Sequence, residues 1–296
     1  MIDLRRLRVL RALAEYGTLT AAAHALYLTP SAASQQVRQL GKELGVTLLE
    51  PHGRHVYLTP KARELLHHAE AIEQCWEQAQ ARLHADAPPS GELRVCGITT
   101  AVSALLAPAA VTMRERFPEV RMRIVEAEPP ACFDLLFRGA VDLAVTMATP
   151  ESPPLEDPGF ESLPLLEDPY DLLTAPEHPL AGADRVRLAD LAREQWVLGM
   201  PETAYRQTIL ALCGTAGFTP DIAHEVFEWS AVAGLAGRGL GIALLPRLVR
   251  LPAEPAVVRT PLADPAPSRP LLTVTRRGAG GHPLITAALT VLRELC

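Results

Sequence analysis

Apolar positions recur with helical spacing, separated by polar ones, over about the first 44 residues. Apolar residues three or four apart predict a first helix that ends at Gly17. Thr18 is a suitable N-cap for a second short helix over 19–25. The pair Thr29-Pro30 predicts a third helix over 30–44, because threonine at the N-cap and proline at the first helical position favour a helix start.

Two short strand-like runs follow the third helix, over 46–50 and 55–58, with a turn between them. Three helices and a small hairpin form a winged helix-turn-helix, a module that places its third helix in the major groove of DNA. The apolar positions of that helix, among them Val37 and Leu40, predict its buried face. Its polar positions are left for the outer face.

Small polar side chains near the start of a recognition helix can hydrogen-bond to base edges, and glutamine can pair with adenine. Nearby cationic side chains can hold phosphates and fix the register on DNA. The residues expected at DNA are Thr18, Thr29, Pro30, Ser31, Ser34, Gln35, Arg38, Arg54 and Lys61. The alternative is a three-helix interaction module whose polar face is only solvated.

A long amphipathic helix is predicted over 60–84, again started by a Thr-Pro pair. Its apolar stripe needs a cover, either a partner helix from a second subunit or the chain's own domain. The sequence Ala-Pro-Pro-Ser-Gly at 87–91 then predicts a hinge.

Strand and helix patterns alternate after Gly91, which predicts an α/β domain with a largely parallel sheet and helices on both faces. The proline-rich stretch over 150–169 is expected to be loop, with strand resuming at 170–174. Acidic pairs such as Glu167-Asp168 are expected in solvated loops.

The charge distribution separates the start of the chain from the rest. The 296 residues carry a formal net charge of -6, which by itself argues against nucleic-acid binding. Residues 1–61, however, hold eight Lys/Arg and four Asp/Glu, a net charge of +4, and the remainder carries -10. A basic head on an acidic body indicates a nucleic-acid module.

Several other function classes lack the required residues. Five scattered cysteines with no Cys-x-x-Cys predict reduced thiols, and the absence of a signal peptide or a long apolar run predicts a soluble, cytoplasmic protein. The spacing of Gly237, Gly239 and Gly241 does not suit a dinucleotide site and predicts a turn at a helix end. No metal set or Gly-x-Ser-x-Gly elbow occurs, so no enzyme, cofactor or metal is expected.

The stretch "AEYGTLTAAAHALYLTPSAASQQVRQLGKELGVTLLEPHGRHVYLT" resembles the DNA-binding domain of LysR-type transcriptional regulators. Later segments, such as "GITTAVSALLAPAAVTMRERFPEV" and "VAGLAGRGLGIALLP", are similar to the effector domain of that family. Gly41 stands where the family often has glutamate, and glycine inside a helix costs about 1 kcal/mol.

The resemblance implies a winged helix-turn-helix over 1–59, a dimerising linker helix over 60–86 and a hinge over 87–91. It also implies a periplasmic-binding-protein-like effector domain over 92–296, with lobe I at about 92–165 and 268–296 and lobe II at about 166–267. Dimers or tetramers that bind near-palindromic double-stranded DNA, and contact with RNA polymerase, are further implications.

An effector cleft is expected between the two lobes. The hydroxyls and amides of Thr99, Thr100 and Ala101, at a helix start, suit a carboxylate or another anion. By resemblance, Thr146, Met200, Thr203 and Trp229 should also border the cleft. No lysine lies beyond residue 61, so an anionic effector would pair with arginine, for instance Arg206.

The sequence therefore predicts a transcriptional regulator that binds DNA through its head and a small-molecule effector through its cleft. The alternative is a small-molecule-binding protein whose N-terminal helices serve only assembly. Salt-dependent, sequence-selective DNA binding separates the two hypotheses.

Overall fold

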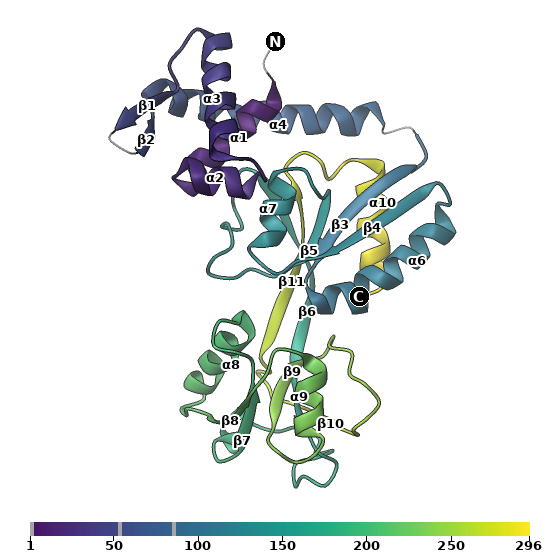
Figure 1. The fold of residues 1–296 in the computed structure, drawn as a ribbon. Helices are drawn as coiled ribbons and strands as arrows, with labels where there is room; N and C mark the ends of the chain where they lie inside the picture. The colour runs from purple at the N-terminus through teal and green to yellow at the C-terminus, as the bar shows by residue number, and fades with distance from the viewer. Residues whose placement is uncertain (1–2, 53–54, 85–86) are drawn as a thin grey trace.

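The computed structural model describes residues 3–52, 55–84 and 87–296 (Figure 1). The head contains α1 (Leu4–Tyr16), α2 (Leu19–Ala25) and α3 (Pro30–Leu44), followed by the antiparallel strands β1 (Leu49–His52) and β2 (His55–Leu58). The three predicted helices are confirmed, and the first strand begins three residues later than expected. Leucines, valines and alanines of all three helices, with Ala62 and Ala69 of the following helix, form one buried core.

The linker helix α4 (Pro60–Leu83) begins at Pro60 with Thr59 as its N-cap, as predicted. The Thr59 hydroxyl accepts a bond from the Ala62 amide and donates to the Thr47 carbonyl, which ties the wing to the helix. The N-terminal part of its apolar stripe packs on the chain's own head. Farther along, Ile72, Trp76 and Leu83 are exposed on the single chain.

Lobe I, as we use the term, comprises β3 (Gly91–Gly97), β4 (Val120–Glu126), β5 (Leu143–Thr146) and the helices around them. One face of these strands packs on α10 (Pro283–Glu294) and on a continuous helical stretch. That stretch consists of α5 (Thr99–Ala101), a π-helical turn (Val102–Leu106) and α6 (Ala107–Arg116). The other face packs on α7 (Ala131–Phe137).

Lobe II contains β7 (Gln195–Leu198), β8 (Asp221–Glu225), β9 (Ala243–Pro246) and β10 (Val258–Pro261). Helices α8 (Ala204–Thr215) and α9 (Trp229–Ala236) and the 3-10 turn Leu188–Leu191 pack around them. Gly237 follows α9, and Gly239 has a φ of +72°, so these glycines do form a turn at a helix end.

Two long strands, β6 (Phe160–Thr174) and β11 (Ser268–Arg276), run from lobe I into lobe II (Figure 1). The sheet order is β10-β6-β11-β5-β3-β4, with β9 also on β6. Only β3 pairs in parallel within this sheet, with β4 and β5. The expectation of a largely parallel sheet was therefore wrong, because the two long crossing strands pair antiparallel with each other and with their neighbours.

The proline-rich stretch also differs from its prediction, because β6 already begins at Phe160. The ladder between β6 and β11 shifts register between Leu271 and Leu272, opposite the segment that follows Pro164. Such a bulge lets a strand accommodate a residue that lacks an amide donor. Prolines were therefore a misleading sign of loop here.

Asp168 does not lie in a solvated loop, although the sequence suggested it. Its carboxylate is fully buried, accepts two bonds from the Arg269 guanidinium at 2.8 and 3.0 Å, and accepts a third from the Leu248 amide. A buried carboxylate needs such partners. In the part of the chain that the structure describes, no helix is long and apolar enough to cross a membrane.

Candidate DNA-binding surface and effector cleft

Local capping and packing set the position of helix α3. The Thr29 hydroxyl accepts a bond from the Ala32 amide at 3.2 Å, and Pro30 occupies the first helical turn. Ala33, Val37 and Leu40 are fully buried, as the pattern predicts. The helix ends at Gly45 in the left-handed region, with φ of +66°. These anchors determine which side chains α3 presents to solvent.

Four predicted DNA-binding side chains share the outer face of α3. Gln35 and Arg38 are exposed and Ser34 is half-buried, and none of the three side chains has a partner among the described residues. Ser31, also exposed, shares a 3.0 Å hydrogen bond with Thr29. Positions 31, 34, 35 and 38 recur at helical spacing, so one groove could receive all four.

The other predicted DNA residues have different positions. The Thr18 hydroxyl caps α2 by accepting a hydrogen bond from the Ala21 amide at 3.1 Å. The hydroxyls of Thr18 and Thr29 therefore both serve as N-caps within the head. Pro30 is exposed beside Thr29. Arg54 lies outside the described residues.

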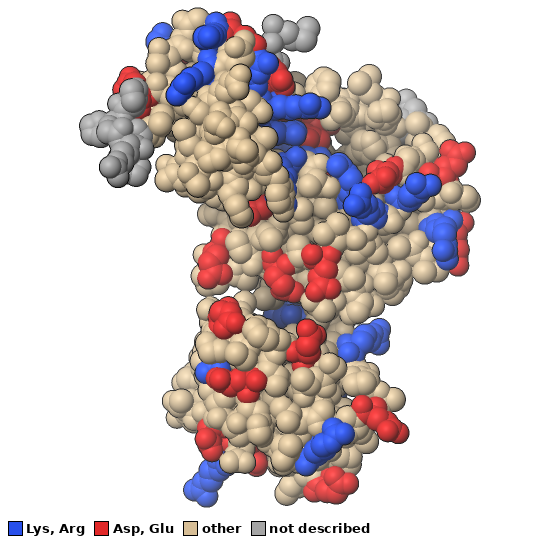
Figure 2. Space-filling model, in the orientation of Figure 1, with Lys and Arg blue, Asp and Glu red and all other residues tan. Residues whose placement is uncertain are grey.

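The basic side chains of the head fall into two groups. Arg6 pairs with Glu43, and Arg8 and Arg11 both pair with Glu73 of α4, at 3.5 and 2.8 Å. These three guanidiniums already have carboxylate partners. Exposed cations remain on the head and in the first turns of α4 (Figure 2). Those without a partner among the described residues are Arg5, Arg38, Lys42, Lys61 and Arg63.

Close packing explains why position 41 is a glycine, which the sequence did not reveal. Gly41 is buried, and a Cβ added there would lie 2.6 Å from the Val46 carbonyl oxygen. The turn after α3 therefore approaches the helix too closely for any side chain at this position.

On lobe I, the carboxyl ends of β3, β4 and β5 bring together the predicted cleft residues and two acidic ones. The Thr99 amide donates to Glu128 Oε1 at 3.2 Å, and the Thr99 hydroxyl donates to Glu126 Oε1 at 2.8 Å. A carboxylate does sit at this helix start, as the residues favour, but it is the chain's own. An effector carboxylate would have to displace Glu128 there.

The neighbouring residues are more deeply placed. The Thr100 hydroxyl accepts a bond from Arg269 Nη2 at 2.8 Å, and Ala101 is fully buried in the lobe I core. Thr146, at the end of β5, is fully buried, and its hydroxyl has no hydrogen-bond partner among the described residues. Ala101 therefore presents no side chain to solvent.

On lobe II, the predicted residues follow β7 and β8. The Thr203 hydroxyl caps α8 and donates to the Met200 carbonyl at 2.8 Å. Trp229, half-buried, meets the Tyr205 ring edge-on with centroids 4.8 Å apart. Arg206 pairs with Glu225 and donates to the Gly199 carbonyl, so it is not a free partner for an anion.

The surface narrows between the two lobes, and acidic side chains line both rims of this hollow (Figure 2). In each lobe, the residues above follow the carboxyl ends of parallel strands, where α/β folds bind ligands. Sequence reasoning missed Glu126, Glu128, Tyr205 and Arg269. Glu126 and Glu128 carried a usable signal, since Glu126 ends the strand β4 (Val120–Glu126) and Glu128 lies two residues beyond it.

Two family models match the chain. Residues 4–63 match the bacterial regulatory helix-turn-helix protein, lysR family, and residues 86–296 match the LysR substrate binding domain. The chain belongs to the LysR family.

Similar proteins span nearly the whole length of this LysR-family chain. A probable hydrogen peroxide-inducible genes activator of Mycobacterium avium is 31% identical over 93% of this chain and 88% of its own. A RuBisCO operon transcriptional regulator of Allochromatium vinosum is 29% identical over 82% of this chain and 79% of its own. A solved structure of an OxyR mutant of Corynebacterium glutamicum is 25% identical and has a TM-score of 0.62. The match covers 100% of this chain and 92% of the OxyR chain. A full-length OxyR mutant of Pseudomonas aeruginosa, at 21% identity and 99% and 95% coverage, shares the fold with a TM-score of 0.66.

Membership makes the chain a ligand-responsive, DNA-binding transcriptional regulator of LysR type. The family consists of transcription regulators rather than enzymes. The alternative, in which the head serves only assembly, finds no support in these similarities.

Proposed function

We propose that the outer face of α3 reads the operator, with Ser31, Ser34 and Gln35 toward base edges and Arg38 toward phosphate. The supporting observation is that the side chains of Ser34, Gln35 and Arg38 stand on one solvent-facing stripe without partners among the described residues. Thr18, Thr29 and Pro30 contribute by holding the helix starts near DNA, and Arg54 by a phosphate contact from the wing.

The test is a gel shift with duplexes selected from a random pool, over a range of salt concentrations. Gln35→Ala should weaken binding to the selected duplex by about 1–3 kcal/mol and leave non-specific binding unchanged. Gln207→Ala, an exposed glutamine on lobe II, is the control. If Gln35→Ala binds the selected duplex as tightly as Gln207→Ala does, the assignment is refuted.

We further propose that the effector lies between the lobes, against Thr99, Thr100, Thr146, Met200, Thr203 and Trp229, with Ala101 behind them. A thermal-shift screen of anionic, neutral and cationic metabolites tests this. Trp229→Ala should abolish the shift from a metabolite that stabilises the unaltered chain. A shift that survives both Trp229→Ala and Thr203→Val would place the ligand elsewhere.

The exposed Ile72, Trp76 and Leu83 support a dimer formed through α4, because exposed apolar side chains on a long helix favour burial against a partner helix.

We propose the domain division predicted from the sequence: head 1–59, linker helix 60–86, hinge 87–91 and effector domain 92–296. Dimers or tetramers would then bind two half-sites, contact RNA polymerase and work in the cytoplasm, without enzymatic activity.

A further inference from the structure

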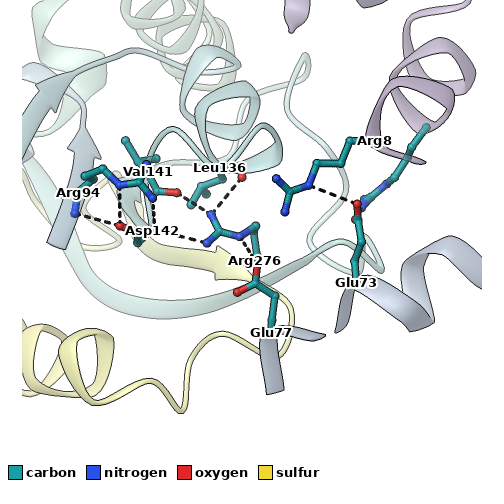
Figure 3. Close-up of polar contacts among 9 residues, drawn as sticks. Arg8, Glu73, Glu77, Arg94, Leu136, Val141, Asp142 and Arg276 are labelled. Atoms are coloured by element: carbon teal, nitrogen blue, oxygen red, sulfur yellow. Dashed lines mark hydrogen bonds and ion pairs between the residues drawn. The ribbon is translucent and has the colours of Figure 1, made fainter. Parts of the chain in front are cut away.

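The head, the linker helix and lobe I meet at one polar junction (Figure 3). On the lobe I side, Arg276 donates to Glu77 of α4 at 2.7 Å and to the carbonyls of Val141 and Leu136 at 2.7 and 3.3 Å. On the head side, Arg8 and Arg11 of α1 pair with Glu73 of the same linker helix. The C-terminal end of α7 therefore lies where all three parts are tied together.

Side chains of α7 and its C-cap also contact the head directly. Arg138 Nη1 donates to the Ala25 carbonyl at 3.0 Å, and its guanidinium carbon lies 4.1 Å from the centre of the Tyr27 ring. Tyr16 donates to the Asp134 carboxylate. Arg11 of the head lies over the Phe137 ring at 4.8 Å.

The segment that Arg138 touches is the turn between α2 and α3. Tyr27 has a φ of +54°, a left-handed conformation that costs energy for a bulky residue and persists only when its surroundings hold it. The cation beside Ala25 also lies at the C-terminal end of α2, where the helix dipole favours positive charge. Arg138 thus stabilises the turn that orients the recognition helix.

These contacts leave the DNA-reading face open. They involve α1, α2 and the turn, whereas the described side chains at positions 34, 35 and 38 of α3 have no partner. The junction accordingly sets the orientation of the head on lobe I and does not cover its binding surface.

The opposite end of α7 begins at the cleft. Glu128, three residues before α7, accepts the bond from the Thr99 amide, and Cys132 in its first turn donates to the Ala127 carbonyl at 2.9 Å. A helix of this length spans about 10 Å, and it is packed on the sheet as one unit. Only Pro129 and Pro130 separate Glu128 from α7, so a movement at Glu128 that they pass to the helix would displace Arg138.

We propose that α7 is a latch that holds the head on lobe I through Arg138, Asp134 and Phe137, and that it carries changes at Glu128 to the head. The regulatory use of this latch rests on the proposed effector cleft. The physical coupling between its two ends does not, and it can be measured without an effector or DNA.

Hydrogen–deuterium exchange of the full-length chain tests the latch at the turn amides of 26–28, which are bonded within the head. Arg138→Ala should speed their exchange at least five-fold. Glu128→Gln, at the cleft end, should speed the same amides at least two-fold. The matched controls Arg123→Ala and Glu151→Gln, exposed on lobe I without partners among the described residues, should leave them within 1.5-fold of the unaltered chain.

Two results would overturn the proposal. One is unchanged exchange at 26–28 in Arg138→Ala. The other is Glu128→Gln speeding exchange only near Thr99 while the turn stays as in the unaltered chain. Arg138→Lys, which keeps the charge but loses the fork geometry, guards against a folding defect and should give an intermediate rate. Selective DNA binding of the unaltered chain, measured separately, decides the proposed function independently.

Discussion

Asp168 and Arg269 form a buried ion pair at the crossing of the two long strands, with Nη2 of Arg269 2.8 Å from the Asp168 carboxylate. The same nitrogen donates to the Thr100 hydroxyl in α5, and Asp168 also accepts a hydrogen bond from the Leu248 amide. One pair thus joins both crossing strands to lobe I and lobe II.

Removing one member of that pair should destabilise the effector domain strongly. Asp168→Ala leaves a guanidinium that is 11% exposed without its carboxylate, a loss of about 3–5 kcal/mol. Thermal unfolding followed by circular dichroism measures it. Asp264→Ala, which breaks the exposed pair with Arg185, should leave the midpoint unchanged. Equal midpoints for the two variants would contradict the role assigned to burial.

Gly41→Ala should destabilise the head, although alanine is the better helix former. The gain in helix propensity is about 1 kcal/mol, but the added Cβ meets a backbone carbonyl at 2.6 Å, so the turn must shift. We expect a net loss of about 1–3 kcal/mol. Gly214→Ala on α8, where nothing lies within 4 Å of the added Cβ, should instead be neutral or stabilising. Urea unfolding of both variants decides the sign.

Arg38→Ala should weaken binding to all duplexes alike. A phosphate contact releases a counterion, so its loss lowers the slope of log K against log salt by about 1. Arg193→Ala, an exposed arginine of lobe II, serves as control. A slope that stays the same in Arg38→Ala, with selectivity reduced instead, would make Arg38 a base contact.

His282 should make stability depend on pH. His282 is the N-cap of α10, and its Nδ1 accepts a hydrogen bond from the Leu284 amide. This bond requires the neutral imidazole ring, because a protonated Nδ1 cannot accept. Burial, followed by nearby His84, holds the pKa of His282 below its ordinary 6.5. The folded state then binds fewer protons than the unfolded state, so stability is full above pH 6.5 and falls as the pH drops toward the folded pKa.

His282→Asn keeps a cap acceptor and removes the titration, so its unfolding midpoint should change less between about pH 7.5 and 5.5 than that of the unaltered chain. His224→Asn on β8 is the control. If His282→Asn retains the full pH dependence, other groups produce it.

Three thiols should resist modification in the native chain. Cys96, Cys132 and Cys213 are buried, and burial raises the pKa of Cys213 to about 11. Since the thiolate is the reactive form, Ellman's reagent at about pH 7.5 should titrate at most Cys75 and Cys296 until denaturant is added. Fast reaction of a third thiol would show that a buried cysteine is accessible or activated.

The elements of the head and the outer face of α3 follow from the sequence alone. Their signals are local: caps at Thr18 and Thr29, stops at Gly17 and Gly45, and one apolar stripe. Interactions within a few residues of one another set such features, so the pattern was sufficient.

Which side chains meet across the chain depends instead on how the elements pack. Thr99 and Glu128 are 29 residues apart, Asp168 and Arg269 are 101 apart, and Ala25 and Arg138 are 113 apart. No periodicity encodes such pairs, because the strand order, the crossing strands and the packing of the head on α7 bring them together. The same packing turned a proline-rich stretch into strand and buried Asp168, since a long-range partner can outweigh local preference.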